Sequence, residues 1–67
     1  MSVAKVSEIS STSKKSFEDA IEQGIARASK TIRNIKSVWI KEQYVRVENS
    51  KPSEYQVNMM VTFVIDD

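Results

Sequence analysis

The stretch Glu54-Tyr55-Gln56-Val57-Asn58-Met59-Met60-Val61-Thr62-Phe63-Val64-Ile65 decides the fold. Its apolar residues recur at every second position, and this alternation predicts a β-strand with one apolar face and one mixed face. The apolar set comprises Tyr55, Val57, Met59, Val61, Phe63 and Ile65. The mixed set comprises Gln56, Asn58, Met60, Thr62 and Val64. We expect the apolar set to face a helix and the mixed set to face away from it.

A second strand is predicted just before this one, at Ser37–Val47, where Val, Ile, Trp and Tyr are frequent. The short polar segment Glu48–Ser53 joins the two strands, so they should form an antiparallel hairpin. Val38 and Ile40 suit the helix side of this strand. The opposite face would then carry Trp39, Lys41, Gln43, Val45 and Val47. The apolar phase changes near Lys41–Tyr44, which indicates either a β-bulge or a second partner over the outer half of the strand.

Upstream of the hairpin, residues from about Lys14 to Asn34 show the periodicity of an α-helix. One stripe of this helix carries Phe17, Ile21, Ile25, Ala28, Ile32 and Ile35. A neighbouring row of small residues, where another element can approach closely, is formed by Ala20, Gly24 and Ala28. Ser13 and Ser16 are both candidate N-caps. We predict that Phe17, Ile21, Ile25 and Ile32 pack against Val57, Met59, Val61 and Phe63.

The first element is the least distinct part of the chain. Residues Ala4–Ser10 alternate poorly, and we expect a short strand there that runs into a polar turn at Ser10–Ser13. The order of elements is then strand, helix, strand, strand (β-α-β-β). This order predicts an α+β fold in a single domain, residues 1–67, with one face of the sheet packed on the helix.

Size and composition favour self-association. A chain of 67 residues is marginally stable as a single core, and without Cys or His it has no disulfide and no Cys/His zinc site, which leaves oligomerisation. The 10 basic and 9 acidic residues lack the basic excess of a nucleic-acid binder. No apolar run approaches the length of a membrane span. Residues Met1–Lys5 lack the apolar core of a signal peptide, so we expect a cytoplasmic protein.

The hairpin carries more apolar surface than one helix can cover. Trp39, Val45, Val47, Met60 and Val64 cannot all reach the helix. Soluble monomers rarely leave large apolar patches bare. We therefore expect another subunit or a ligand to cover this surface.

Several segments recur in order and at spacings that resemble the dodecin family over nearly the whole chain. They are Lys5-Val6, Ser11-Thr12-Ser13, Ser16–Ile21, Ala26–Ile35, Ile40-Lys41-Glu42, Glu54–Val57 and Val61-Thr62-Phe63. The resemblance implies a three-stranded antiparallel sheet wrapped on one helix, and a hollow homo-oligomer of twelve copies. It also implies that flavins (riboflavin, FMN or FAD) bind between subunits, stacked on tryptophans, for storage or photoprotection.

The resemblance also nominates three binding residues. The flavin-contacting glutamine of the family lies in a Tyr-Gln pair on the last strand, and Tyr55-Gln56 matches it. Its amide can both donate and accept hydrogen bonds at a flavin edge. The stacking tryptophan lies nineteen residues earlier, where this chain has Ser37. Trp39 lies two residues later on the same strand face, displaced by roughly 6–7 Å. The candidate cofactor-binding residues are therefore Gln56, Trp39 and Ser37.

Alternative interpretations remain open at these positions. Trp39 also suits the core of a subunit interface, and Gln56 also suits a solvated or inter-strand position. Some dodecin relatives that lack the tryptophan are associated with calcium. The alternative is thus a shell that binds no flavin, with an ion such as calcium in its place, or an interaction protein. Asp66-Asp67 would need several more oxygen ligands to bind calcium.

Catalysis finds little support in the sequence. The chain has no His or Cys for acid-base or nucleophilic work, and no glycine-rich phosphate loop. Glu, Asp, Lys and Tyr are present, but no spacing singles out a reactive pair. We therefore expect a binding protein and no enzyme.

Overall fold

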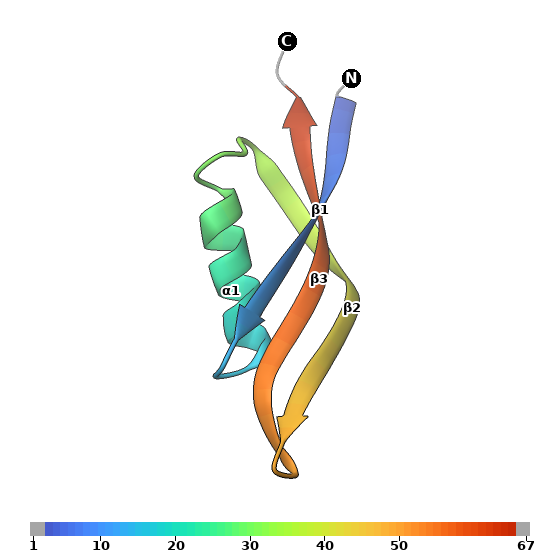
Figure 1. Ribbon diagram of the computed structural model, residues 1–67. Coiled ribbons are helices and arrows are strands. Elements are labelled where there is room, and N and C mark those ends of the chain that lie inside the picture. The colour runs from blue at the N-terminus through green and yellow to red at the C-terminus, as the bar shows by residue number, and fades with distance from the viewer. Residues whose placement is uncertain (1–2, 66–67) are drawn as a thin grey trace.

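The computed structural model describes residues 3–65 and contains one helix and three strands (Figure 1). In chain order these are β1 (Val3–Ser13), α1 (Phe17–Ala28), β2 (Ile35–Glu48) and β3 (Lys51–Ile65). β3 lies in the centre of the sheet and pairs antiparallel with both β1 and β2. The predicted β-α-β-β order and antiparallel sheet are confirmed. Asp66-Asp67, considered above for calcium, lie outside the described residues.

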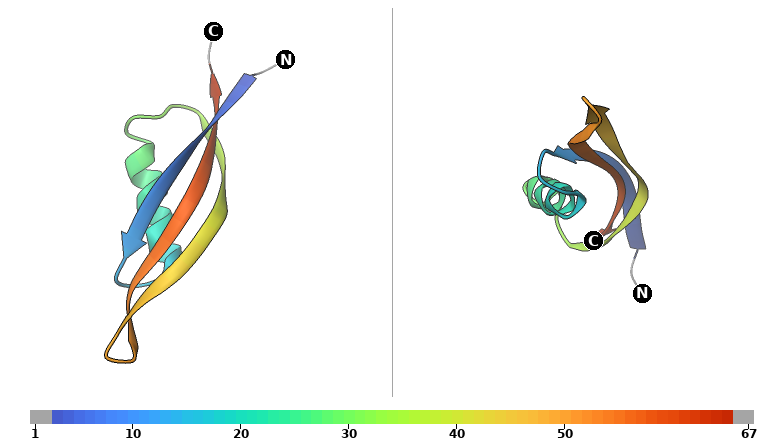
Figure 2. Two further views of the ribbon diagram at one scale, coloured as in Figure 1. Left: turned by 45° about the vertical axis from the view of Figure 1, so that its right-hand side comes forward. Right: turned by 90° about the horizontal axis from the view of Figure 1, so that it is seen from below.

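The sheet curls around the helix, so α1 lies on its concave side (Figure 2). The β2–β3 hairpin projects well past the end of α1 (Figures 1 and 2). The principal extents are 51, 19 and 13 Å. The radius of gyration is 13.8 Å, against about 10.9 Å for a compact domain of this length. The protomer is therefore an elongated body with one end uncovered by its helix.

The core lies between α1 and the middle of β3. Val57, Met59 and Val61 are fully buried, as the alternation of this strand predicts. The helix meets them with its small residues, Ala20 above all. A methyl group added at Gly24 would lie 2.5 Å from Met59 Cε and 3.0 Å from Ser11 Cβ, so a larger residue here would displace the end of the Met59 side chain and press on β1.

The isoleucine stripe of the helix contributes less to this core than predicted. Phe17 and Ile21 pack against it, as expected. Ile25 and Ile32 are only half-buried and lie outside it, which corrects the predicted packing. The physical reason is that the small residues of α1 pack directly against β3. The longer side chain of Ile25 then lies at the side of the helix, and Ile32 lies beyond its end at Ala28.

The helix is shorter than predicted. Ser16 is its N-cap, and the Asp19 backbone N–H donates to Ser16 Oγ at 2.9 Å. The helix ends at Ala28, where the predicted end was Asn34. Ser29 Oγ donates to the Ile25 carbonyl at 2.8 Å, and Asn34 adopts a left-handed φ of 60° that redirects the chain into β2. The apolar residues that prolonged the helical pattern belong to this turn and to β2.

β1 is longer than predicted. Residues 10–13, expected to form a polar turn, continue the strand as far as Ser13. Ser11, Thr12 and Ser13 pair with Val57, Gln56 and Tyr55 of β3. Pairing with a central strand therefore overrides the local preference of serine for turns.

The predicted hairpin is confirmed, and its turn is tight. Asn49 and Ser50 join β2 to β3, with φ angles of 52° and 63°. A left-handed φ at both central residues is the geometry of a type I′ turn, whose twist matches that of the flanking strands. Asparagine tolerates this conformation better than most residues, which explains its place at the turn.

β2 contains the bulge that the phase change predicts. The register shifts between Ile40 and Glu42, so Lys41 is an extra residue opposite β3. The bulge moves Gln43 and Val45 onto the helix side, opposite Val57 and Tyr55. Their predicted place on the face of Trp39 is therefore wrong. Another predicted member of that face, Val47, lies beyond a further register shift near the hairpin tip, where it pairs with Pro52.

Candidate ligand-binding face of the sheet

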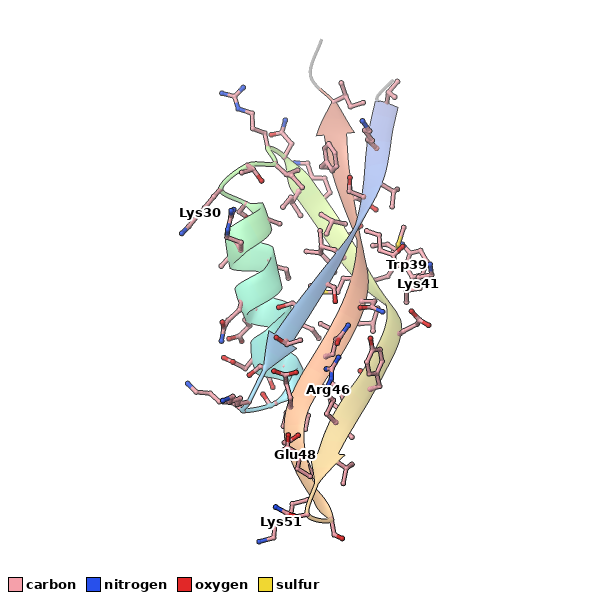
Figure 3. The ribbon with its side chains drawn as sticks, viewed as in Figure 1. Lys30, Trp39, Lys41, Arg46, Glu48 and Lys51 are labelled. Atoms are coloured by element: carbon pink, nitrogen blue, oxygen red, sulfur yellow. The ribbon has the colours of Figure 1, made fainter. Side chains whose placement is uncertain are left out.

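The surface of the sheet that points away from α1 is called the outer face here. Cross-strand pairing defines its members along the three strands. They are Ala4, Val6, Glu8, Ser10 and Thr12 of β1, Ser37, Trp39, Glu42 and Tyr44 of β2, and Gln56, Asn58, Met60, Thr62 and Val64 of β3. Figure 3 shows Trp39 and Lys41 projecting from β2 on the side away from the helix. No element within residues 3–65 covers this face.

The three candidate residues share the outer face but do not meet within one protomer. Ser37 pairs with Thr62, Trp39 with Met60, and Tyr44 with Gln56. Trp39 is thus four positions from Gln56 along β3, about 13 Å at the usual rise of a strand. Ser37 is six positions away, about 20 Å. A single protomer therefore offers separate contacts along a strip, and no closed pocket around all three residues.

Trp39 stands as an open aromatic surface. Trp39 is 54% exposed, although indole is among the largest apolar groups that a protein can bury. Its cross-strand neighbour is Met60, which is half-buried. A flexible thioether beside an exposed indole makes an adaptable apolar surface on which a flat ring can stack.

Gln56 lies in a hydrogen-bonded polar cluster. Its Nε2 donates to Ser10 Oγ at 2.9 Å and to Asn58 Oδ1 at 3.1 Å. Ser10 Oγ donates to Asn58 Oδ1 at 2.9 Å. Asn58 Nδ2 donates to Glu42 Oε1, also at 2.9 Å. We name these four residues, Ser10, Glu42, Gln56 and Asn58, the amide cluster; it draws on all three strands.

The aromatic residue next to Gln56 is Tyr44. Tyr44 is the cross-strand partner of Gln56, and it is 43% exposed. The Arg46 guanidinium lies 5.7 Å from the centre of the Tyr44 ring, within the range of a cation–π contact. Arg46 also pairs with Glu54 at 3.1 Å. An aromatic ring and a guanidinium paired with Glu54 therefore lie beside the amide cluster.

An ion pair lies close to Trp39 on the outer face. Lys41 Nζ is 3.3 Å from Glu8 Oε1, so the bulge residue of β2 reaches β1 across the central strand. Both side chains are nearly half exposed, and a solvent-exposed pair of this kind adds little to stability. Glu8 lies in the same cross-strand row as Met60 and Trp39, and Lys41 lies between Trp39 and Glu42 along β2.

The sequence does not predict that Tyr44, Glu42 and Ser10 are neighbours of Gln56. Alternation does place Asn58 on the same face as Gln56. The phase change near Lys41 carried the signal for Glu42 and Tyr44, because a bulge at Lys41 moves both residues to the outer face. Ser10 offered no signal, since its position depends on the register between β1 and β3, which are far apart in the sequence.

The ionisable groups do not form a metal centre within one protomer. Among residues 3–65, no group of three or more acidic side chains lies close enough to hold a metal ion. Asp19, at the start of α1, has a pKa below its ordinary value. Its pKa is lowered because the Ser13 hydroxyl donates to Oδ2 at 2.6 Å, although burial opposes this effect; Gln23 and Lys15 lower it further. This group lies away from the outer face.

A separate apolar groove runs between α1 and β2 on the concave side of the sheet. It has a volume of about 400 Å³, and its apolar lining residues are Ile21, Ile25, Ile35, Val38 and Ile40. α1 packs mainly over β1 and β3, so part of the inner side of β2 lies beside the helix and not beneath it, although Val38 and Ile40 still reach the core. The side chains that the helix leaves uncovered form this groove.

The protomer exposes more surface than its mass requires. Its accessible surface is 5024 Å², against about 4,300 Å² for a compact monomer of 7.6 kDa. Large apolar residues that remain exposed include Val6, Trp39, Tyr44, Val47 and Ile65. The excess area is of the size that one partner buries in an ordinary protein–protein interface, about 800 Å².

Comparison of the sequence and the fold with those of known proteins identifies the family. The family model described as Dodecin matches residues 3–66. A single-residue variant of the Thermus thermophilus dodecin superposes with a TM-score of 0.94 at 33% identity, with 100% of both chains covered. The dodecin of Streptomyces davaonensis gives a TM-score of 0.92 at 30% identity, covering 98% of this chain and 97% of that chain.

A third related structure is that of a calcium-binding dodecin. The calcium dodecin of Mycobacterium tuberculosis, described with a novel calcium-binding site, has a TM-score of 0.82 at 28% identity. The match covers 96% of this chain and 91% of that chain. No curated protein sequence matches this chain.

The chain belongs to the dodecin family, as the resemblance in its sequence predicts. Dodecins are small binding and storage proteins. Within residues 3–65, no helix is both long enough and apolar enough to cross a membrane.

Proposed function

We propose that this chain assembles with copies of itself into a closed shell that holds a flavin on the outer face, where copies meet. One observation carries the proposal: Trp39, Tyr44 and Gln56 are displayed on a sheet face that its own helix does not cover. A flat conjugated ring needs an aromatic wall and a few placed hydrogen bonds at its edge. Storage or sequestration of riboflavin or its phosphate is the role that follows.

The position of the aromatic wall distinguishes this chain from flavin-binding relatives that carry the stacking tryptophan. Ser37 is too small to stack on a ring, and Trp39 lies two residues further along β2. The separation of Trp39 from Gln56 in one protomer means that a ring at Gln56 receives its indole wall from a neighbouring copy, or stacks on Tyr44. We expect weaker binding and less quenching of flavin fluorescence than in tryptophan-bearing relatives.

A fluorescence titration with riboflavin tests the proposal. Gln56→Ala and Trp39→Ala should weaken binding several-fold, while Ser37→Trp should tighten it by adding the missing wall. Gln43→Ala is the matched control, because Gln43 lies on the opposite side of the same hairpin. The flavin proposal is rejected if wild-type protein shows no saturable binding and Ser37→Trp creates none.

Assembly is a separate part of the proposal. The uncovered groove between α1 and β2 and the excess accessible surface support association of identical copies. We expect a dodecamer with no stable folded monomer. Light scattering on dilute protein measures the assembled mass, and a folded species of 7.6 kDa at micromolar concentration would contradict this expectation.

Calcium is a second candidate ligand, favoured by the similarity to the calcium dodecin of Mycobacterium tuberculosis. One protomer brings together no group of three acidic side chains within residues 3–65, so such a site would draw carboxylates from several copies. Calorimetric titration of the assembled protein with calcium tests this candidate. Saturable calcium binding without flavin binding would favour it over the flavin shell.

A further inference from the structure

The Glu42 carboxylate fixes the direction of the hydrogen bonds in the amide cluster, which is called its polarity. Asn58 and Gln56 each carry a donor end and an acceptor end, and either amide can in principle be reversed. An ionised carboxylate can only accept. Because Glu42 Oε1 lies 2.9 Å from the Asn58 amide, Asn58 must turn its Nδ2 toward Glu42. Its Oδ1 then points to the opposite side.

The polarity of Asn58 determines that of Gln56. Asn58 Oδ1 accepts from Gln56 Nε2 at 3.1 Å and from Ser10 Oγ at 2.9 Å. A reversed Gln56 would place two carbonyl oxygens at that short distance without a proton between them. Gln56 therefore commits Nε2 to the cluster, where Ser10 Oγ also accepts from it. Within residues 3–65, no hydrogen-bond donor is engaged with Gln56 Oε1.

We propose that Glu42 and Asn58 are positioning residues that hold Gln56 with its carbonyl oxygen toward the ligand, so that the site selects ring edges bearing an N–H donor. This inference rests on the proposed flavin site and specifies its chemistry. The imide edge of an isoalloxazine ring presents such an N–H between two carbonyl groups. Planar rings with the same imide or lactam edge form the class of ligand selected, and Tyr44 offers them an adjacent aromatic surface.

A pair of ligands measures this selection directly. Riboflavin carries the imide N–H, and N3-methylriboflavin replaces that hydrogen with a methyl group. Wild-type protein should bind riboflavin about tenfold more tightly, the effect of one lost hydrogen bond at a partly desolvated site. Gln56→Ala removes the acceptor and should bring the ratio of the two affinities close to one.

Variants of the positioning residues separate polarity from simple structural damage. Glu42→Gln introduces a group that can donate as well as accept, so Asn58 and Gln56 lose their fixed orientation and the ratio should fall several-fold. Asn58→Asp in the same chain should restore the ratio, because the new carboxylate at position 58 again accepts from Gln56 while the amide at position 42 donates to it. Damage to the fold would weaken both ligands alike and leave the ratio unchanged.

The inference is overturned if Glu42→Gln keeps the wild-type ratio, or if the double variant fails to restore it. A second measurement is independent of ligand binding. Neutron diffraction from ligand-free, deuterated crystals locates the amide deuterons of Gln56 and Asn58. Gln56 Nε2 directed at Ser10 and Asn58 supports the inference, and Nε2 directed outward overturns it. Absence of flavin binding by wild-type protein would refute the proposed function and leave this second measurement decisive for the polarity.

Discussion

The two faces of β3 differ in how deeply their side chains are buried. On the concave side, Val57, Met59 and Val61 are fully buried against a helix. On the outer face, the intervening Gln56, Asn58 and Met60 are only partly covered. One strand thus supplies the core with its odd-numbered residues and an open surface with its even-numbered ones. The comparison shows that residues of the core and residues available for binding alternate along the same strand.

The separation explains how a short chain can keep a stable fold and still display polar and aromatic side chains for binding. Burial of apolar area is the main favourable term in folding, and it is concentrated on the concave side. Away from the contacts between copies, substitutions on the outer face should therefore alter binding with less effect on stability. Substitutions on the concave side should do the reverse.

Adjacent methionines offer the largest contrast between the faces. Met59→Ala removes a fully buried side chain and should lower the free energy of unfolding by roughly 2–5 kcal/mol, because it leaves a cavity. Met60→Ala should lower it by about 1 kcal/mol, since its side chain is already partly in water. Chemical denaturation at equal protomer concentration measures both values. Equal losses for the two variants would contradict the separation of the faces.

The groove between α1 and β2 sharpens the comparison, because it is an apolar surface that a single protomer leaves open. Ile25→Ala should lower the free energy of unfolding by about 2 kcal/mol, provided that a second copy covers the groove. On dilution, the variant should also dissociate at a higher protein concentration than wild type does. Ala26→Ser, on the exposed side of α1, is the control. An Ile25→Ala variant that dissociates and unfolds like wild type would show that the groove is not an interface.

The smallest expected effect concerns pH and the start of α1. The Ser13 hydroxyl lowers the pKa of Asp19, whose ordinary value is 3.8. A carboxyl with a lowered folded-state pKa stabilises the protein above its unfolded pKa, and this stabilisation is lost as pH falls through the folded value. Ser13→Ala should therefore be less stable than wild type at pH 7, and the difference should narrow below about pH 4.

Denaturation curves of wild type and Ser13→Ala at pH 7 and at pH 2–3 check this expectation. Ser29→Ala is the control, because Ser29 Oγ donates to a backbone carbonyl that does not titrate. Its difference from wild type should not change between the two pH values. A Ser13→Ala difference that is equally independent of pH would contradict the role of Asp19.

Much of the fold could be predicted because the alternation in β3 is regular from Tyr55 to Ile65. Periodicity failed where pairing with distant residues decides the structure. Residues 10–13 look like a turn and form a strand because β3 lies beside them. Residues 29–34 continue an apolar helical pattern, yet the chain leaves the helix after Ala28 to begin β2. The local sequence indicates neither the pairing of residues 10–13 with β3 nor the end of the helix at Ala28.

The candidate site could be predicted only in outline. Alternation places Ser37, Trp39 and Gln56 on one face, and the register of the sheet agrees with this. Their spacing along β3 and the amide cluster follow from the register of three strands and from the bulge at Lys41. A shift of one residue in a strand moves every side chain to the other face. The phase change predicts a bulge as one of two alternatives, but it does not predict that Gln43 and Val45 move to the helix side.

A crystal structure of the protein grown with riboflavin tests the central claim most directly. The account predicts an isoalloxazine ring on the outer face at a contact between copies, with its imide edge against Gln56 Oε1 and an aromatic side chain, Tyr44 or a neighbouring copy's Trp39, stacked on its plane. A ring seated in the groove between α1 and β2, or an assembled protein with an empty outer face at saturating riboflavin, would contradict it.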